Sequence, residues 1–280
     1  MLMVSPSATS PKLTDEDTSG LLWRTAPSDE RQGEAIADDM KAPGQGRTAP
    51  VSSVAVIYND DAYGHGLQVS FATAFELAEE GTVKTFAYSD EKSSYIELDR
   101  AIANAGRADV EEVLFISAQN QEIRHFMDAI EDAEDYVDKN IFLTDMAATR
   151  EVLSLVPESV RGRVRGSRPA PLDPSDDGTL YPAFLSSYEA QHGDYLVDET
   201  FTANAYDAAW LVAYGAAWAV LQRNSTLSAH NMADGLRQLS ASNEQQIEVG
   251  PQGWERVLEE FAEGRAINIT GASGDLDYDP

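Results

Sequence analysis

The sequence of 280 residues contains no cysteine, and this absence excludes disulfides, thiolate nucleophiles and cysteine-based zinc sites together. Basic residues are scarce as well: 20 Lys and Arg stand against 48 Asp and Glu, for a formal net charge of −28. So acidic a chain repels a phosphate backbone unless a basic patch intervenes. The densest basic run, RGRVRGSR at residues 161–168, is better explained as a solvated strand with its flanks. We therefore expect no nucleic-acid partner.

The sequence shown also has no secretory signal and no apolar run long enough for a membrane span. Its start, MLMVSPSATS, has neither a basic stretch nor a long apolar stretch, so any export signal is expected upstream of it. The most apolar segment, residues 201–221, contains Asp207, and its uncharged part falls short of the roughly 20 residues that a spanning helix needs. We expect a buried helix there.

Between residues 51 and 165 the chain alternates strand patterns with helix patterns. Short apolar runs predict strands at 53–58, 82–88, 112–117, 140–144 and 163–167. Helical spacing of apolar residues predicts helices at 65–80, 95–107, 121–136 and 147–156. Because strands that alternate with helices form parallel sheets with right-handed crossovers, we predict an α/β fold in which helices flank a parallel sheet.

The segments on either side follow a different pattern. Upstream, we predict a short strand at 21–25, a helix at 27–40 with Ser28 or Asp29 near its cap, and an exposed linker at 41–50. Downstream, helices are expected at 178–192, 202–223, 228–239 and 252–264, with little strand between them. The sequence before residue 51 offers few strands for these helices to cover. Either the first domain is small, or part of it is absent from this sequence.

The stretch NDDAYGHGLQ, residues 59–68, joins the first predicted strand to its helix and is a candidate phosphate or metal loop. A dinucleotide fingerprint requires a third glycine where Val69 stands, and a P-loop requires a lysine after Gly66. An EF-hand loop that begins at Asn59 requires a glutamate where Ser70 stands. The acidic turns at 173–178 and 275–280 also fail as EF-hand loops, so the sequence assigns no metal site.

Hydrolytic signatures are missing too. GASG at 271–274 lacks the spacing of a nucleophile elbow. The four histidines, His65, His125, His192 and His230, are scattered, and none lies in an H-E-x-x-H motif. We therefore assign no catalytic residue and no cofactor, and we expect a binding protein and not an enzyme.

Four parts of the chain, in a consistent order, resemble the type I periplasmic binding proteins, the branched-chain amino-acid receptor family of ABC importers. They are VSPSATSPKLT with LLWRTAPSDERQGEAIADDM, the corner VAVIYNDDAYGHGLQVSFATAFELAEEG, the helix FTANAYDAAWLVAYGAAWAV, and ITGASGDLDYD near the end. The resemblance implies two α/β lobes that close on a ligand about a hinge. It assigns residues 51–165 to the C-terminal lobe, and residues 1–50 and 166–280 to an N-terminal lobe that is incomplete because its opening half is expected to be absent.

The resemblance also carries binding positions onto single residues. Ser7, Ala8 and Thr9 match the loop whose hydroxyl and backbone N–H donors hold the ligand carboxylate. Helix capping is the alternative role for Ser7 and Thr9. Tyr63 matches the aromatic residue that faces the ligand from the C-terminal lobe, and its alternative role is packing on its own helix.

Two further positions depart from the family pattern. Gln119 follows the strand at 112–117 and stands where the amino-acid receptors often carry an aromatic residue. Asp145 follows the strand at 140–144 and lies at, or next to, the acid that usually pairs with the ammonium group of the ligand. The resemblance therefore leaves open whether the ligand is a standard α-amino acid.

By this resemblance we expect an extracytoplasmic solute-binding protein that captures a small polar ligand, for example an amino acid, between two lobes for an ABC importer. The alternative is a sensing or protein-interaction module of the same fold, such as a cell-wall synthase activator or a receptor ectodomain. The expected partners are the small molecule and a permease or another membrane or envelope protein. The expected location is periplasmic or extracellular, and the resemblance is compatible with a lipid anchor on a longer precursor.

Overall fold

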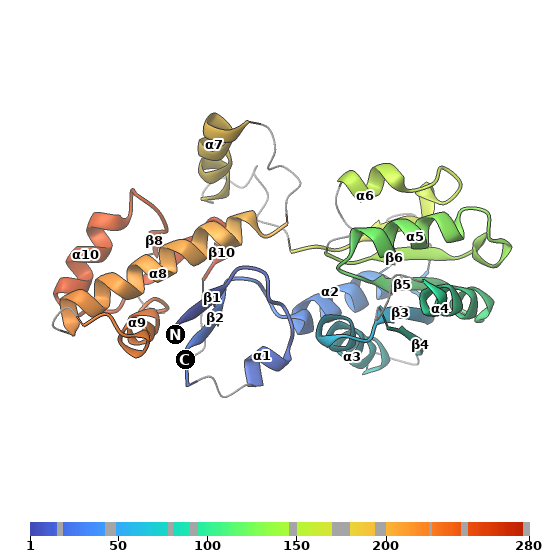
Figure 1. Cartoon of the computed structure of the whole chain (residues 1–280), viewed down its shortest axis with the longest axis horizontal. Helices are drawn as coiled ribbons and strands as arrows, with labels where there is room; N and C mark the ends of the chain where they lie inside the picture. The colour runs from blue at the N-terminus through green and yellow to red at the C-terminus, as the bar shows by residue number, and fades with distance from the viewer. Residues whose placement is uncertain are drawn as a thin grey trace. The chain divides into compact units, whose positions relative to one another are not determined.

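The computed structural model describes residues 1–15, 19–42, 49–77, 81–89, 95–145, 150–169, 180–193, 200–223, 226–241 and 246–276. The chain divides into two units (Figure 1). Unit 1 contains Met1–Ala8, Glu16–Ala26 and Ala170–Pro280, and unit 2 contains Thr9–Asp15 and Pro27–Pro169. Parts of four predicted segments, residues 43–48, 78–80, 147–149 and 178–179, lie outside the described residues.

The alternating segment forms a five-stranded parallel sheet in unit 2, as its strand patterns predict. In spatial order the strands are β4 (Thr82–Tyr88), β3 (Ser53–Asn59), β5 (Glu112–Ile116), β6 (Asn140–Leu143) and β7 (Val164–Gly166). Every residue of β5 is buried, as is expected of a central strand with both faces covered. The prediction of an α/β fold with a helix-flanked parallel sheet is confirmed, and the carboxyl ends of these strands meet at one edge.

Helices cover both faces of this sheet. They are α2 (Asp29–Lys41), α3 (Ala62–Leu77), α4 (Ile96–Arg107), α5 (Asn120–Ile130) and α6 (Arg150–Leu155). Val54 and Val56 of β3 lie in one hydrophobic cluster with residues of α2 and α3. Ala55 and Ile57 lie in a second cluster with residues of α4, α5 and α6. Alternate side chains of β3 thus face opposite sides of the sheet, and both sides are covered by helices.

The segment after α5 departs from the prediction. A single helix was expected over 121–136, but α5 ends at Ile130 and the 3-10 turn η1 (Glu134–Tyr136) follows. Between them Ala133 has an extended backbone, with φ −80° and ψ 113°, which an α-helix does not accommodate. Unit 2 also contains the short helix α1 (Lys12–Asp15) and the 3-10 turn η3 (Arg161–Arg163).

The division into units differs from the expected domain limits at three segments: residues 9–15, 27–50 and 166–169 were expected in the N-terminal lobe and belong to unit 2. For residues 27–50 the physical reason is packing: Ile36 and Met40 of α2 are fully buried, and they share a cluster with Phe71 of α3. The apolar face of α2 therefore covers the sheet of unit 2.

Unit 1 contains a parallel strand pair and a small separate sheet. β1 (Met3–Ser5) pairs with β2 (Leu22–Arg24), the strand predicted at 21–25. A second sheet, in the order β10 (Gly274–Asp275), β9 (Asn268–Gly271) and β8 (Gln246–Glu248), was not predicted. Its strands are only two to four residues long, so their side chains are too few to show a period-2 pattern.

The helices of unit 1 occur at the predicted segments. They are α7 (Tyr181–His192), α8 (Thr202–Gln222), α9 (Ala229–Leu236) and α10 (Trp254–Ala262). Leu211 and Tyr214 of α8 are fully buried in a cluster with Leu236, Phe261 and Ile269. Within the described residues, no helix combines the length and apolar character needed to cross a membrane.

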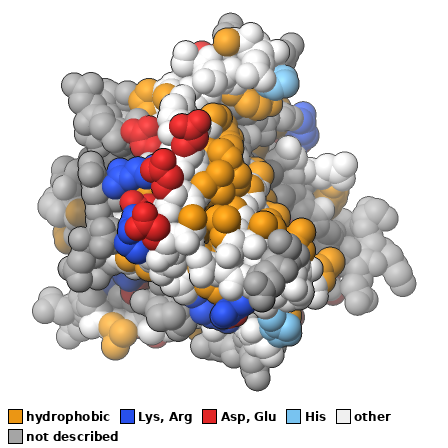
Figure 2. Space-filling model, turned by 90° about the vertical axis from the view of Figure 1, so that its left-hand side faces the viewer, with side chains coloured by type: hydrophobic (Ala, Val, Ile, Leu, Met, Phe, Trp, Pro, Cys, Tyr) orange, Lys and Arg blue, Asp and Glu red, His pale blue; other side chains and the backbone are white. Residues whose placement is uncertain are grey.

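The long helix α8 has both buried side chains and exposed apolar side chains. The carboxylate of the buried Asp207 accepts hydrogen bonds from the Ala272 N–H at 2.9 Å and from the Ser273 N–H at 2.8 Å, which ties α8 to the turn between β9 and β10. At other positions of the helix, Val212, Val220 and Leu221 are 41%, 42% and 42% exposed. Figure 2 shows hydrophobic side chains gathered in a band on the side of unit 1 that faces the viewer, beside charged side chains.

Candidate ligand-binding site

The turn between β3 and α3 sets the position of Tyr63. Asp61 is the residue before α3, and its Oδ1 accepts a hydrogen bond from the Gly64 N–H at 2.7 Å, as an N-cap side chain does. A Cβ at Gly64 would lie 2.1 Å from the Asn59 carbonyl oxygen, so the first turn of the helix approaches the strand end too closely for any other residue. Gly64, one of the two glycines that do not fit a phosphate loop, thus permits a tight corner between strand and helix.

Tyr63 reaches across the sheet edge to the end of another strand. Its hydroxyl oxygen lies 3.0 Å from the Oγ1 of Thr144, which is fully buried directly after β6. The ring also packs against the hydrophobic cluster between α3 and the sheet, and the side chain stays partly exposed. Tyr63 therefore does more than pack on its own helix, the alternative raised by the sequence.

Asp145, next along the chain, is a buried carboxyl group with an amide partner from a helix. It is 3% exposed, and its Oδ1 accepts a hydrogen bond from the side-chain amide of Gln32 in α2. The same amide nitrogen donates to the Oγ of Ser167, after β7, at 3.1 Å. Burial raises the pKa of Asp145 to about 6, and the hydrogen bonds from Gln32 and Tyr63 oppose that rise only in part.

The electrostatics of Tyr63 follow from the same neighbours. Burial raises the pKa of its phenol well above 10.0, and the negative charge of Asp145 adds to the rise. The charge of Asp29, a fully buried residue at the start of α2, acts in the same direction. Tyr63 is therefore a neutral hydroxyl group that donates or accepts a hydrogen bond and carries no charge at physiological pH.

Gln119 lies at the same carboxyl edge, after β5, which runs between β3 and β6. It is exposed and precedes α5, and its N–H donates to the Oγ of Ser117 at 3.1 Å. Ser117 in turn donates to the Oε2 of Glu122 at 2.5 Å, and the Tyr88 hydroxyl donates to the same oxygen at 2.6 Å. This buried network fixes the turn that carries Gln119.

The three predicted residues near the N-terminus divide between the units. Ser7 and Ala8 belong to unit 1, Ser7 is exposed, and the Ala8 N–H donates to the Oγ of Ser5 at 3.1 Å within its own turn. Thr9 belongs to unit 2, is 7% exposed, and accepts a hydrogen bond from the Asp29 N–H at its carbonyl oxygen at 2.9 Å. Neither Ser7 nor Thr9 caps α1, because that helix begins at Lys12.

Sequence reasoning missed three members of the edge cluster: Gln32, Thr144 and Ser167. Thr144 and Ser167 each follow a predicted strand, a position where parallel sheets present polar side chains to ligands, so this signal was available. Gln32 lies on α2, 113 residues before Asp145 in the chain, and no local sequence pattern predicts the contact between them. Among the described residues, no group of three or more His, Asp or Glu is placed to hold a metal ion. Residues 173–178 and 277–280, tested above for calcium, lie outside the described part of the chain.

The chain is an α/β protein whose parallel sheet has buried polar side chains at its carboxyl edge, the edge at which ligands bind in open α/β sheets. The family model described as the receptor family ligand binding region matches residues 1–280. The chain therefore belongs to this family, the type I periplasmic binding proteins that its motifs resemble. A search of curated proteins found no match.

Solved structures of solute-binding proteins share this fold. A leucine binding protein from Thermotoga maritima is 19% identical, with a TM-score of 0.65 over 99% of this chain and 65% of that chain. An ABC transporter substrate-binding protein from Desulfitobacterium hafniense, in complex with Leu, is 18% identical, with a TM-score of 0.57 over 86% of this chain and 63% of that chain. A solute binding protein from R. palustris, in complex with 4-hydroxybenzoate, is 15% identical, with a TM-score of 0.64 over 100% of this chain and 64% of that chain. The chain thus spans less than two thirds of the length of these proteins, and such identities show the fold alone.

Proposed function

We propose that this chain is the ligand-binding part of an extracytoplasmic solute-binding protein that captures a small polar molecule between two lobes for an ABC importer. The observation that carries the proposal is the cluster of Tyr63, Thr144, Asp145 and Gln32 at the carboxyl edge of the unit 2 sheet. It combines an aromatic ring, a buried carboxyl group and hydroxyl and amide groups, which suits a small polar ligand. The fold neighbours named above support a small organic ligand, since one is a leucine binding protein and another is in complex with 4-hydroxybenzoate.

The chemistry of the cluster favours a ligand with a cationic group. Asp145 ionises above about pH 6, and a carboxylate in a water-poor site pairs strongly with an ammonium group. The partly exposed ring of Tyr63 offers a face to the same ammonium or to the ligand side chain. We further propose that Ser7 and Thr9 supply hydroxyl donors, and Ala8 its backbone, to a ligand carboxylate, and that Gln119 contacts the remainder of the ligand.

The proposed mechanism is closure of the two lobes about a hinge. Ligand docks on Ser7 and Ala8, the groups of unit 2, with Thr9 among them, then close on it, and a membrane permease recognises the closed form. On this proposal the protein works in the periplasm or outside the cell. A sensing module of the same fold is the second candidate, and the exposed amide of Gln119, in place of an aromatic ring, is the feature that favours it.

A thermal-shift screen of amino acids, amines and small carboxylates tests the proposal. A ligand present at about 100 times its Kd should stabilise the chain by about 2.7 kcal/mol. Tyr63→Ala should weaken the affinity for the ligand found by tenfold or more, because it removes both the ring and the hydroxyl contact. Tyr63→Phe keeps the ring and separates the two effects.

The matched control is Tyr95→Ala, which removes another partly exposed tyrosine of unit 2 that stacks on His125 and not on the edge cluster. Circular dichroism should show the same secondary structure in all three variants. A screen in which no compound stabilises the unaltered chain would favour the sensing module. An affinity that Tyr63→Ala leaves unchanged would remove Tyr63 from the site.

A further inference from the structure

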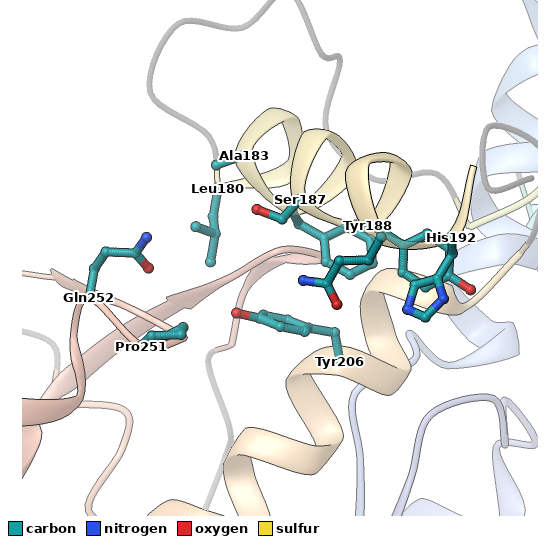
Figure 3. A pocket seen from close by; sticks show the side chains of 10 residues that line it. Leu180, Ala183, Ser187, Tyr188, His192, Tyr206, Pro251 and Gln252 are labelled. Carbon is teal, nitrogen blue, oxygen red and sulfur yellow. The ribbon is translucent and has the colours of Figure 1, made fainter. Parts of the chain in front are cut away.

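Unit 1 contains a pocket that none of the proposed binding residues touches. Its volume is about 300 Å³, and its walls come from α7, from the start of α8 and from the loop after β8. Figure 3 shows Leu180, Ala183, Ser187, Tyr188 and His192 on the α7 side, the Tyr206 side chain below them, and Pro251 and Gln252 on the third side. This volume is at the lower end of the range of about 300–1,000 Å³ that ligand sites occupy, so it suits a ligand of one ring.

The floor and one wall of this pocket are held in place by the fold. The Tyr206 ring lies 5.0 Å from the Phe184 ring, between centroids. The Tyr206 hydroxyl reaches the backbone of Gly250, where a Cβ would lie only 2.6 Å from that oxygen and where φ is +137°. The Gly250 N–H also donates to the buried Tyr214 hydroxyl at 3.1 Å. Only glycine fits this position, and the loop that carries Gln252 is thereby fixed against α8.

The start of α8 is anchored just as firmly. The Asn204 side-chain amide donates to the Thr25 carbonyl oxygen at 2.7 Å, and the Thr25 hydroxyl donates to the Asn204 carbonyl oxygen at 2.8 Å. This reciprocal pair joins the first turn of α8 to the end of β2 and sets the direction in which Tyr206, two residues later, projects. The pocket therefore has an aromatic floor that exists before any ligand arrives, which lowers the cost of binding.

The polar groups of the pocket decide which ligand it suits. Ser187, Gln191 and Gln252 are neutral and can each donate and accept hydrogen bonds. None of the described lining residues is Lys, Arg, Asp or Glu, and His192 is the one among them that protonation can make positive. The net charge of −28 opposes an anion. An ammonium ligand finds no carboxylate among the described lining residues. A hydrocarbon would cover the amides and leave them without hydrogen-bond partners.

We propose that this pocket binds a single neutral sugar ring. A sugar ring has an apolar face that stacks on an aromatic side chain such as Tyr206 and a rim of hydroxyl groups that match neutral amides and a serine hydroxyl. The site is separate from the Tyr63 cluster, because its lining residues belong to unit 1. The inference does not depend on the proposed function.

Saturation-transfer difference NMR tests this inference with methyl glucoside, methyl galactoside and N-acetylglucosamine, and with phenol and choline as comparison ligands. At least one sugar should receive saturation through its ring protons, and phenol and choline should receive less. Ala183→Trp, which fills the pocket from α7, should abolish the sugar signal. Gln252→Leu should lower the affinity about tenfold, because it removes one amide and keeps the side-chain size.

Two control variants should leave sugar binding unchanged. Gln238→Leu makes the same chemical change in unit 1 at an amide that donates to the Asp234 carbonyl oxygen and does not line the pocket. Tyr63→Ala alters the unit 2 cluster alone. The inference is overturned if none of the sugars binds, if phenol or choline binds in their place, or if Tyr63→Ala removes the sugar signal. If Ala183→Trp fails to fold, an unchanged affinity in Gln252→Leu overturns it equally.

Discussion

At the scale of one residue, the fold raises the pKa of the Asp145 carboxyl group by burying it. The side chain is 3% exposed just after β6, and hydrogen bonds from an amide, a phenol and the backbone oppose the desolvation of its charge only in part. Its pKa of about 6 means that the group is mostly protonated at mildly acidic pH and ionised near neutrality. A ligand ammonium that pairs with the carboxylate would favour the ionised form and lower this pKa.

The raised pKa of Asp145 predicts a particular dependence of stability on pH. The folded chain holds a proton, with a pKa of about 6, that the unfolded chain releases near the usual value of 3.8. The contribution of Asp145 to the free energy of unfolding is therefore complete below about pH 4 and is lost as the pH rises through 6, by on the order of 3 kcal/mol. Asp145→Asn should remove this loss, so urea unfolding of the variant should vary less between pH 4 and 7 than that of the unaltered chain.

The same substitution at an exposed carboxylate is the control for this measurement. Asp128→Asn on α5 should unfold with the pH dependence of the unaltered chain, because Asp128 is exposed. Other buried carboxyl groups, such as Asp207, remain in every variant and cancel from the comparison. If Asp145→Asn and the unaltered chain show parallel pH curves, the carboxyl group of Asp145 is not desolvated as the structure indicates.

The family resemblance identified Tyr63 and Asp145 as candidate binding residues, and the structure brings both side chains to the end of β6. Their roles in binding remain proposals. Gln32 was missed because a contact across 113 residues leaves no mark in local spacing. The N-cap role of Asp61 was missed because the helix was expected to begin at residue 65, whereas α3 begins at Ala62.

At the scale of elements, α8 illustrates how one helix serves two environments. Leu211 is fully buried among residues of α9, α10 and β9, whereas Leu221, ten residues later, is 42% exposed. Leu211→Ala should lower the free energy of unfolding by about 2–5 kcal/mol, because it opens a cavity in a packed core. Leu221→Ala makes the same change at an exposed position near the end of the helix and should cost less than about 1 kcal/mol.

Urea unfolding followed by tryptophan fluorescence measures both variants. Trp210 and Trp218 lie on the same helix, so the signal reports the element that is altered. Equal losses of stability in the two variants would show that the side chain of Leu221 is buried in solution and not exposed as it is in the structure.

The elements that sequence predicted well and those it missed differ in burial and in length. β3 and β5 were clear because both faces of each strand are covered, which requires continuous apolar runs such as VAVI and VLFI. The sheet of β8, β9 and β10 was missed because Gln246 and Glu248 flank a single buried residue, Ile247, and one apolar residue makes no pattern. Short strands of this kind are defined by their partners, which only the folded structure supplies.

At the scale of the whole molecule, the hydrophobic cores are separate. Each of the three clusters of buried side chains draws its members from one unit: two lie in unit 2 and one lies in unit 1. The tryptophans follow the same division, since Trp23, Trp210, Trp218 and Trp254 are all residues of unit 1. Tryptophan fluorescence therefore reports on unit 1, while far-ultraviolet circular dichroism reports on the helices and strands of both units.

Because the hydrophobic clusters of the two units are separate, we expect a mutation in one unit to change only one of these two signals. Ile123 of α5 is fully buried in a unit 2 cluster, and Ile123→Ala should destabilise that unit by about 2–5 kcal/mol. In urea, the variant should show an earlier transition by circular dichroism and an unchanged midpoint by tryptophan fluorescence, because local cores unfold with their own free energies. Leu211→Ala is the reciprocal control and should move the fluorescence midpoint. If Ile123→Ala moves both signals together, the two units unfold as one cooperative body, and closure about a hinge would have to act on units that stabilise each other.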